Sequence, residues 1–198
     1  MKEHKKNSLN FNFYVLKILE SIDKSWTLFL DRDGVINDEK HEDYINTWEE
    51  FKFYPGVLEA IKTFTQKFGR IFIVTNQRGV AKGVTKLSDL ELIHKNLLES
   101  IEKTEGKVDK IYYSPELDNN HITRKPNTGM GLQAKKDFPE VDFAKSIMIG
   151  NTLSDMQFGK NLGVAATIFL PTTRPDVKIP NELIDIVFPD LISVARVL

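Results

Sequence analysis

Cysteine is absent from all 198 residues of this chain. Its absence excludes disulfide bonds, and it also excludes zinc sites that are built on thiolates. A chain without disulfides fits a reducing compartment, which leads us to expect a cytoplasmic protein.

The chain also lacks long apolar runs and an excess of either charge. No apolar stretch is long enough to span a membrane, and residues 1–19 resemble a signal peptide only loosely, because Asn12 and Lys17 interrupt the apolar part. The formal net charge is −1, whereas nucleic-acid-binding proteins usually carry a basic excess. We therefore expect no membrane partner and no nucleic-acid partner, and either a monomer or a dimer.

The composition that remains is that of a globular protein, with 41% hydrophobic and 28% charged residues. This length fits one domain with a small appendage. Residues 9–22 place apolar side chains at helical spacing, so residues 1–25 are expected to form an N-terminal helical extension and residues 26–198 the domain. The helix either packs on the core or serves as a subunit contact or lid, and we favour packing.

Apolar runs and helical patterns alternate along the rest of the chain. The runs predict strands at residues 26–31, 70–75, 108–113, 146–149, 164–170 and 184–187. The helical patterns cover residues 57–68, 87–103, 126–137, 152–162 and 191–197. This alternation predicts an α/β fold, a Rossmann-like three-layer sandwich with a mostly parallel sheet.

Reactive side chains follow four of the expected strands. In open parallel sheets, ligands bind beyond the carboxyl ends of the strands, so side chains at these ends should converge. The residues at these four ends are Asp31 and Asp33, then Thr75, Asn76 and Gln77, then Arg124 and Lys125 beyond a polar loop, and finally Asn151 and Asp155.

These residue types suit phosphoryl transfer. Asp31 can attack phosphorus and form an aspartyl-phosphate, and Asp33 can protonate the leaving alcohol and then activate water. Mg²⁺ would bridge Asp31 and the phosphate, since it prefers hard oxygen ligands. Thr75 and Lys125 would hold the non-bridging phosphoryl oxygens.

The four segments resemble the motifs of the haloacid dehalogenase superfamily of phosphatases. They read Asp31-Arg32-Asp33-Gly34, Val74-Thr75-Asn76-Gln77, Arg124-Lys125-Pro126 and Ile149-Gly150-Asn151-Thr152-Leu153-Ser154-Asp155. Their extended forms, such as Thr-Asn-Gln-Arg-Gly-Val-Ala-Lys-Gly, are similar to the heptose-1,7-bisphosphate and histidinol-phosphate phosphatases. The resemblance runs from about residue 26 to 170 and rests on four motifs in order.

The resemblance implies roles for single residues. Asp31 would be the nucleophile and a Mg²⁺ ligand, and Asp33 would be the acid/base and give its main-chain carbonyl to the metal. The substrate would be bound by Arg32, Asn76, Gln77, Arg78 and Arg124, beside the catalytic Thr75 and Lys125. Asn151 and Asp155 would complete the metal site.

This chain departs from the resemblance at two places. The family pattern has Asp where this chain has Asn151, and an uncharged amide should bind Mg²⁺ more weakly, with Asp155 compensating directly or through water. The loop of residues 114–123 contains only His121 in place of a Cys/His zinc loop, so no zinc is expected. All four histidines are interpreted as surface residues.

Nor is there room for a cap domain between residues 79 and 110. A flap of residues 34–53 is expected to cover the site, and Tyr44 and Trp48 either line the pocket or pack beneath the flap. Arg78 and Lys82 either bind a second phosphate or are simply solvated.

The sequence thus predicts a Mg²⁺-dependent phosphomonoesterase that acts on a small phosphorylated metabolite. A sugar bisphosphate or histidinol phosphate comes first by resemblance. Two alternatives stay open: a polynucleotide 3′-phosphatase, and a weakly active or non-catalytic relative that binds a phosphate ligand.

Overall fold

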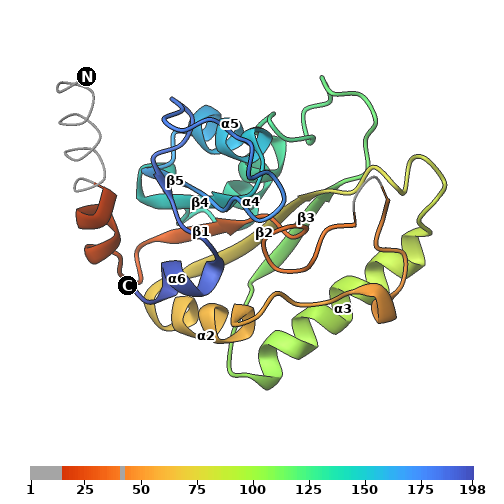
Figure 1. The fold of residues 1–198 in the computed structure, drawn as a ribbon, viewed down its shortest axis with the longest axis horizontal. Coiled ribbons are helices and arrows are strands. Elements are labelled where there is room, and N and C mark those ends of the chain that lie inside the picture. The colour runs from red at the N-terminus through yellow and green to blue at the C-terminus, as the bar shows by residue number, and fades with distance from the viewer. Residues whose placement is uncertain (1–14, 41–42) are drawn as a thin grey trace.

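The computed structural model describes residues 15–40 and 43–198, and these residues form one six-stranded sheet between two layers of helices (Figure 1). The strands are β1 Thr27–Leu30, β2 Arg70–Asn76, β3 Lys110–Ser114, β4 Ser146–Gly150, β5 Ala166–Phe169 and β6 Ile186–Val187. Their order is β3-β2-β1-β4-β5-β6, and each neighbouring pair is parallel. The predicted α/β sandwich is confirmed.

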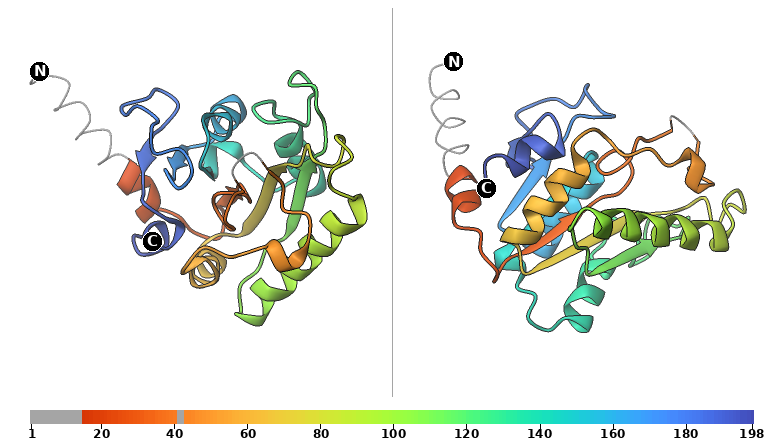
Figure 2. Two further views of the ribbon diagram at one scale, coloured as in Figure 1. Left: turned by 45° about the vertical axis from the view of Figure 1, so that its right-hand side comes forward. Right: turned by 90° about the horizontal axis from the view of Figure 1, so that it is seen from below.

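Helices cover both faces of the sheet because its strands are apolar on both sides (Figure 2). In β1, Leu28 and Leu30 face one cluster, whereas Phe29 faces the other. The first cluster includes residues of α2 Val57–Lys67, α3 Leu87–Lys103 and α6 Leu191–Ala195. The second includes residues of α4 Gly129–Asp137 and α5 Leu153–Leu162.

Several predicted elements begin later than expected. Strands β3, β5 and β6 each start two residues late, at Lys110, Ala166 and Ile186, and α4 starts at Gly129 and not at Pro126. The residues before α4 fold back on the preceding loop, because the Asn127 amide donates to the carbonyls of Asn119 and His121. The N–H of Gly129 donates to Ile122 O at 2.8 Å, which explains why the helix cannot start earlier.

The segment before β1 packs on the core. Residues 15–20 are helical, and the side chains of Val15, Leu19 and Ile22 are buried in the first cluster, with residues of α2, α3 and α6. For these residues the packing interpretation is confirmed, while residues 9–14 of the expected helix, together with His4 and His41, lie outside the described residues. Among the described helices, none has the length and apolarity to cross a membrane.

The flap lies across the carboxyl end of the sheet on aromatic anchors. Trp48, in the 3₁₀ helix Trp48–Glu50, stacks on Phe51 with ring centroids 5.0 Å apart, so it packs beneath the flap. Tyr44 lines the cleft. Between β2 and β3 the chain forms a loop, α3 and a second loop.

The strand order places a switch point beside β1. Strands β2 and β3 follow on one side of β1, and the chain then crosses back to place β4 on the other side of β1. Ligand crevices form where the strand order reverses in this way. Asp31, Thr75 and Asn151 stand at the ends of these three strands.

Candidate active site

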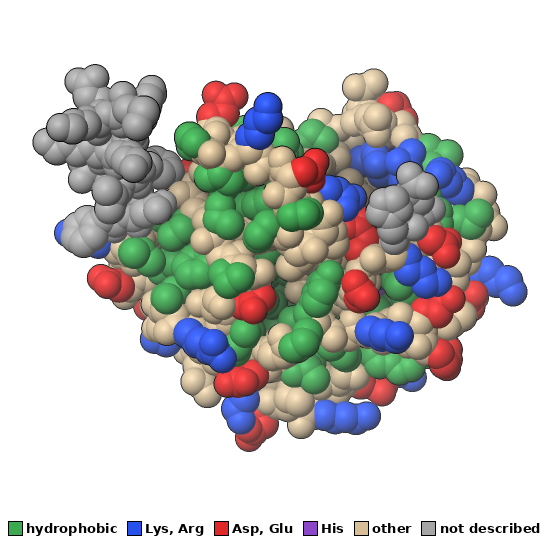
Figure 3. All heavy atoms as spheres, in the orientation of Figure 1, with side chains coloured by type: hydrophobic (Ala, Val, Ile, Leu, Met, Phe, Trp, Pro, Cys, Tyr) green, Lys and Arg blue, Asp and Glu red, His purple; other side chains and the backbone are tan. Residues whose placement is uncertain are grey.

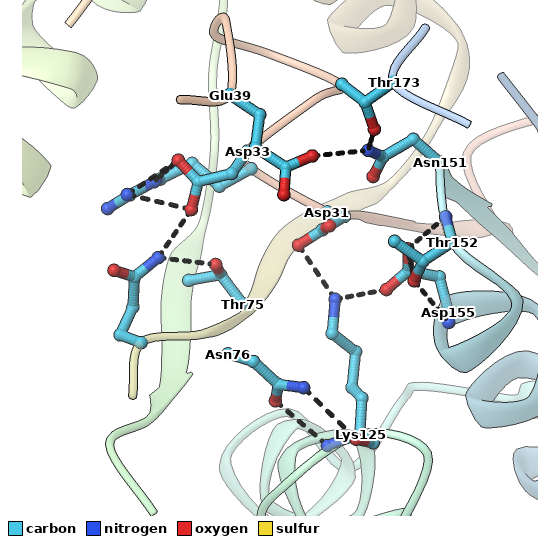
Figure 4. A network of polar contacts seen from close by, with 12 residues as sticks. Asp31, Asp33, Glu39, Thr75, Asn76, Lys125, Asn151, Thr152, Asp155 and Thr173 are labelled. Carbon is cyan, nitrogen blue, oxygen red and sulfur yellow. Dashed lines mark hydrogen bonds and ion pairs between the residues drawn. The ribbon is translucent and has the colours of Figure 1, made fainter. Parts of the chain in front are cut away.

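Asp31 and Lys125 form the centre of the site (Figure 4). Lys125 Nζ lies 2.8 Å from Asp31 Oδ1 and 2.5 Å from Asp155 Oδ1, and all three side chains are largely buried. Burial alone would lower the pKa of Lys125, but the two carboxylates outweigh it and raise that pKa. Lys125 is therefore a fixed cation between two acids.

Burial has the opposite consequence for Asp31. Burial first, and then the negative charge of Asp155, raise the pKa of Asp31 to about 7, although Lys125 opposes this shift. A cation bound beside Asp31 would favour its ionised form, which is the form that can attack phosphorus.

Asp155 holds both Lys125 and the start of α5. Its Oδ2 accepts from the N–H and the hydroxyl of Thr152, at 3.0 Å and 2.7 Å, in a capping box. Its Oδ1 faces Lys125. Both oxygens thus have partners, and metal ligation by Asp155 stays a prediction.

The amide of Asn76 fixes the backbone of Lys125. Its Nδ2 donates to Lys125 O at 3.1 Å, and its Oδ1 accepts from Lys125 N at 3.0 Å. The end of β2 thereby sets the position of the loop that carries the lysine. This contact supports a positioning role for Asn76.

Asp33 is surrounded by donors. Its carboxylate accepts from Arg32 at 2.8 Å, from Asn37 at 2.9 Å and from Gln77 at 2.8 Å. Burial alone would raise the pKa of Asp33, but the charge of Arg32 and these hydrogen bonds outweigh it and lower that pKa. Asp33 is therefore an anion at neutral pH in the free chain.

Arg32 lies beneath the cleft, with only 1% of its residue surface exposed. Its Nε and Nη2 donate to Asp33, and its Nη1 lies 3.1 Å from His94 Nε2. These contacts make Arg32 a positioning residue for Asp33, and substrate contact by Arg32 stays a prediction.

The interpretation of His94 as a surface residue is wrong. The side chain is buried in α3, because it faces Arg32 and the Tyr113 ring. Burial, and then the positive charge of Arg32, lower the pKa of His94 to about 3, so the imidazole is neutral and can accept from the guanidinium.

Gln77 joins the two halves of the site. Its Nε2 donates to Asp33 Oδ2 at 2.8 Å and to Thr75 Oγ1 at 2.9 Å. The hydroxyl of Thr75 therefore lies beside the second acid, and its own proton is available for another acceptor.

Asn151 faces the oxygens of β1 in one of two orientations. In the oxygen-in orientation, Oδ1 faces Asp31 and Asp33, while Nδ2 donates to Thr173 Oγ1 at 2.6 Å and lies 3.4 Å from Glu39 Oε2. In the nitrogen-in orientation, Nδ2 donates to Asp33 O at 3.1 Å and Asp31 Oδ2 at 3.3 Å, and Oδ1 accepts from Thr173.

The oxygen-in orientation fits Mg²⁺. It brings together a carboxylate, a main-chain carbonyl and an amide oxygen with no proton between them, an arrangement that repels itself unless a cation joins it. Within the described residues, no three His, Cys, Asp or Glu side chains form a metal-binding group. Mg²⁺ would therefore rely on the Asp33 carbonyl and the Asn151 amide beside Asp31.

The site opens into a cleft of about 1220 Å³ that is lined by the strand ends and by loops, including the flap. Arg124 lies on one wall, where its guanidinium donates to Asn119 Oδ1 and Glu116 O. Burial, and then the charge of Arg78, lower the pKa of Arg124. Arg78 itself is exposed, so two cations lie near one another beside the cleft.

Comparison with known proteins identifies phosphatases as the relatives of this chain. The family model described as polynucleotide kinase 3 phosphatase matches residues 25–161. A Campylobacter jejuni D-glycero-alpha-D-manno-heptose-1,7-bisphosphate 7-phosphatase is 42% identical over 147 residues, which cover 74% of this chain and 83% of that protein. The chain belongs to the haloacid dehalogenase superfamily of phosphatases.

Two further relatives in this superfamily match most of the chain. A Helicobacter pylori D-glycero-beta-D-manno-heptose-1,7-bisphosphate 7-phosphatase is 36% identical and covers 79% of this chain and 88% of that protein. The crystal structure of the B. bronchiseptica D,D-heptose 1.7-bisphosphate phosphatase, complexed with magnesium and phosphate, has a TM-score of 0.77 at 30% identity and covers 86% and 96% of the two chains. This chain is a hydrolase of phosphoric monoesters.

Sequence reasoning missed several residues of this haloacid dehalogenase site. Asn37 binds Asp33, and Glu39 and Thr173 lie beside Asn151. The rule that reactive side chains follow the carboxyl ends of the strands would have found Thr173, since this residue follows the end of β5 at the same edge of the sheet. Asn37 and Glu39 belong to the flap, where no periodic pattern points to them.

Proposed function

We propose that this phosphatase removes one phosphate from a sugar bisphosphate of the heptose-1,7-bisphosphate type, with Asp31 as nucleophile and Mg²⁺ as cofactor. The observation that carries the proposal is Asp31 at the end of β1, 2.8 Å from Lys125 Nζ and facing the cleft. The relatives named above support the substrate class.

The chain's own residues divide the reaction between them. An oxygen of Asp31 attacks phosphorus, and the bond to the sugar oxygen breaks as the aspartyl-phosphate forms. Asp33 gives its proton to the leaving sugar oxygen and then takes a proton from the water that hydrolyses the intermediate, releasing phosphate and restoring Asp31. Lys125 and Thr75 hold the non-bridging oxygens as charge moves onto them.

The ionised state of Asp33 in the free chain shapes the first step. Asp33 must carry a proton to act as an acid, yet its donors favour the anion. The negative charge of an entering phosphate raises the pKa of a nearby carboxyl, so substrate binding favours the protonated form. Arg32 and Gln77 hold the carboxyl in place meanwhile.

Mg²⁺ would be held by Asp31, the Asp33 carbonyl and Asn151, and when bound it would neutralise charge on the phosphoryl oxygens. Because Asn151 contributes an amide and no charge, we expect weaker Mg²⁺ binding than an aspartate would give. Asn151→Asp should therefore bind Mg²⁺ more tightly.

The second phosphate of a bisphosphate would meet Arg124 and Arg78. Arg124 is held on the wall of the cleft by Asn119 and the Glu116 carbonyl. Lys82 also lines the cleft, with its ammonium 5.5 Å from the centre of the Tyr44 ring. Three cations on one side suit a ligand with a second anionic group.

A polynucleotide 3′-phosphatase is the second candidate, because the matching family model carries that description. Such an enzyme needs a basic track for the nucleic-acid backbone. The net charge is −1, and on the face shown in Figure 3 the described Lys and Arg side chains are interspersed with Asp and Glu, with no continuous basic band. These features favour the small substrate.

A panel of substrates tests the proposal. We expect phosphate release with Mg²⁺ to be most efficient on heptose-1,7-bisphosphate, with both anomers compared, and lower on a heptose monophosphate, histidinol phosphate and a 3′-phosphorylated oligonucleotide. Arg78→Met should raise KM for the bisphosphate more than for the monophosphate, whereas Lys86→Met, outside the cleft, should change neither.

Asp31→Asn is the control for the reaction itself. It should lower phosphate release by at least about 10³-fold, because an amide cannot serve as the nucleophile. Preferred hydrolysis of the oligonucleotide, with salt-dependent binding, would establish the second candidate instead. No release from any member of the panel at high Mg²⁺ would favour a phosphate-binding relative.

A further inference from the structure

The uncharged amide of Asn151 must be turned correctly before it can serve a cation. In the nitrogen-in orientation it donates to Asp31 Oδ2 and Asp33 O, and these contacts satisfy the site without any metal. In the oxygen-in orientation the same two oxygens face a third acceptor. Without a cation the inner oxygens favour the nitrogen-in orientation, so a contact on the outer side is needed to favour the oxygen-in orientation.

Two side chains contact this outer side, and they differ in whether they can donate a hydrogen bond. Thr173 Oγ1 lies 2.6 Å from the amide and has a hydroxyl, so it can accept from Nδ2 or donate to Oδ1 with equal ease. Glu39 Oε2 lies 3.4 Å from the same amide atom, and an ionised carboxylate can only accept. Of these two outer neighbours, Glu39 is the one that favours the oxygen-in orientation.

We propose that Glu39, from the flap, is a positioning residue that holds Asn151 oxygen-in and so prepares the Mg²⁺ site. The carboxylate accepts from Nδ2 in that orientation and repels Oδ1 in the other. Figure 4 shows Glu39 and Thr173 on the side of Asn151 away from Lys125. This inference rests on the metal site of the proposed function.

The contact between Glu39 and Asn151 also brings a negative charge beside the expected metal ligands. An aspartate at this position would bring its own charge, whereas here the flap brings the Glu39 carboxylate to 3.4 Å from the amide. Partners that fix the orientation of a metal ligand and make it more basic strengthen metal binding. Glu39 is in turn held by Arg174, whose Nη2 lies 3.3 Å from Glu39 Oε1.

The glycine of the first motif shows how closely this amide is packed. A Cβ at Gly34 would lie 1.9 Å from the Asn151 amide, so the side chain of Asn151 fills the space that glycine leaves. Asn151 is also fully buried, so turning the amide over exchanges its contacts without moving the side chain. Its orientation is thus a choice between two states.

The experiment measures Mg²⁺ binding to the full chain by calorimetry, without substrate. Glu39→Gln should weaken Mg²⁺ binding about tenfold, because glutamine can donate as well as accept and no longer selects the oxygen-in orientation. Glu49→Gln, which removes the same charge from an exposed flap position, is the matched control and should leave the affinity unchanged. Arg174→Met should change it by less than about threefold, since it leaves the Glu39 carboxylate in place.

The Asn151→Asp background separates positioning from a general charge effect. Aspartate has no NH₂ group to hold, and its charge lies beside Glu39, so Glu39→Gln should leave Mg²⁺ binding unchanged or strengthen it there. A matching signal comes from NMR, in which Mg²⁺ should shift the side-chain NH₂ resonance of Asn151 in the natural chain and shift it less in Glu39→Gln.

Four results would overturn the inference. Equal Mg²⁺ affinity in Glu39→Gln and Glu49→Gln would show that Glu39 does not act on the amide. Equal weakening by Glu39→Gln in the natural chain and in the Asn151→Asp background would show a simple charge effect. Mg²⁺ binding only after Asn151→Asp would overturn the inference but would leave the metal site of the proposed function in place. No Mg²⁺ binding in either background would overturn that metal site as well.

Discussion

Two aspartates only two positions apart have opposite electrostatic environments. Asp31 is buried and lies beside Asp155, which together raise its pKa, whereas Asp33 accepts from Arg32, Asn37 and Gln77, which lower its pKa. Residues with the same chemistry can take different roles when their surroundings separate their pKa values in this way. The division is made by neighbours that come from the turn after β1, the flap, the loop after β2 and α5.

His94 gives the first prediction at the residue scale. Its pKa is lowered to about 3, whereas in the unfolded chain it is near 6.5, so the unfolded state binds more protons between these values. The contribution of His94 to stability is therefore complete above pH 6.5 and is lost as the pH falls toward 3. His94→Gln keeps an acceptor for Arg32 but cannot be protonated.

Urea unfolding at several pH values measures this effect. Between pH 6.5 and 5, the natural chain should lose about 1–2 kcal/mol more stability than His94→Gln does. His121→Gln removes an imidazole whose side chain is 41% exposed, and it serves as the control. Parallel pH profiles for the natural chain and His94→Gln would contradict the buried, neutral imidazole.

At the scale of elements, the turn after β1 depends on Gly34. Its φ is +82°, in the left-handed region that favours glycine, and a Cβ there would lie 1.9 Å from the Asn151 amide. The hydroxyl of Thr172 also donates to the Gly34 carbonyl, which ties the loop after β5 to the same turn. One glycine thus lets three loops meet beside Asp31.

Gly34→Ala tests this close approach against a matched glycine. Gly83 also has a positive φ, of +71°, but nothing lies within 4 Å of a Cβ built there. Both alanine variants should lose about 1 kcal/mol for the backbone conformation, and Gly34→Ala about 1–3 kcal/mol more for displacing Asn151. Urea denaturation of the two variants measures the difference, and equal losses would show that the approach of Asn151 costs nothing.

At the scale of the whole molecule, the segment before β1 is part of the core. Val15, Leu19 and Ile22 are buried with residues of α2 and α6, although they precede the superfamily match at residue 25. The C-terminal helix α6 packs on α2, so both ends of the described chain stabilise the same face of the sheet. The boundary proposed at residue 25 separates sequence motifs and does not separate hydrophobic cores.

Leu19→Ala measures how much this segment contributes. Leu19 is 2% exposed, and its truncation should cost about 2–5 kcal/mol of unfolding free energy. Leu16, on the same turn of the chain but 37% exposed, is the control, and Leu16→Ala should cost less than about 1 kcal/mol. Similar urea midpoints for the two variants would show that the segment folds apart from the domain.

The sequence alone determined the fold class, the order of the elements and most of the polar residues at the strand ends. It could do so because apolar periodicity reports burial directly, and because parallel strands bring their carboxyl ends to one edge. Asp31, Thr75, Lys125 and Asn151 meet at that edge as expected. The predicted start of α4 was wrong because hydrogen bonds to the preceding loop, and not local propensity, set where the helix begins.

Only the tertiary structure decided which groups face one another. Arg32 turned out to bind Asp33 and His94, and Asn76 to clamp Lys125, since side-chain direction depends on neighbours far apart in the chain. The flap contributes Glu39 to Asn151 through a loop that has no periodic pattern. The sequence shows an amide at position 151, but the contacts that orient that amide exist only once the chain has folded.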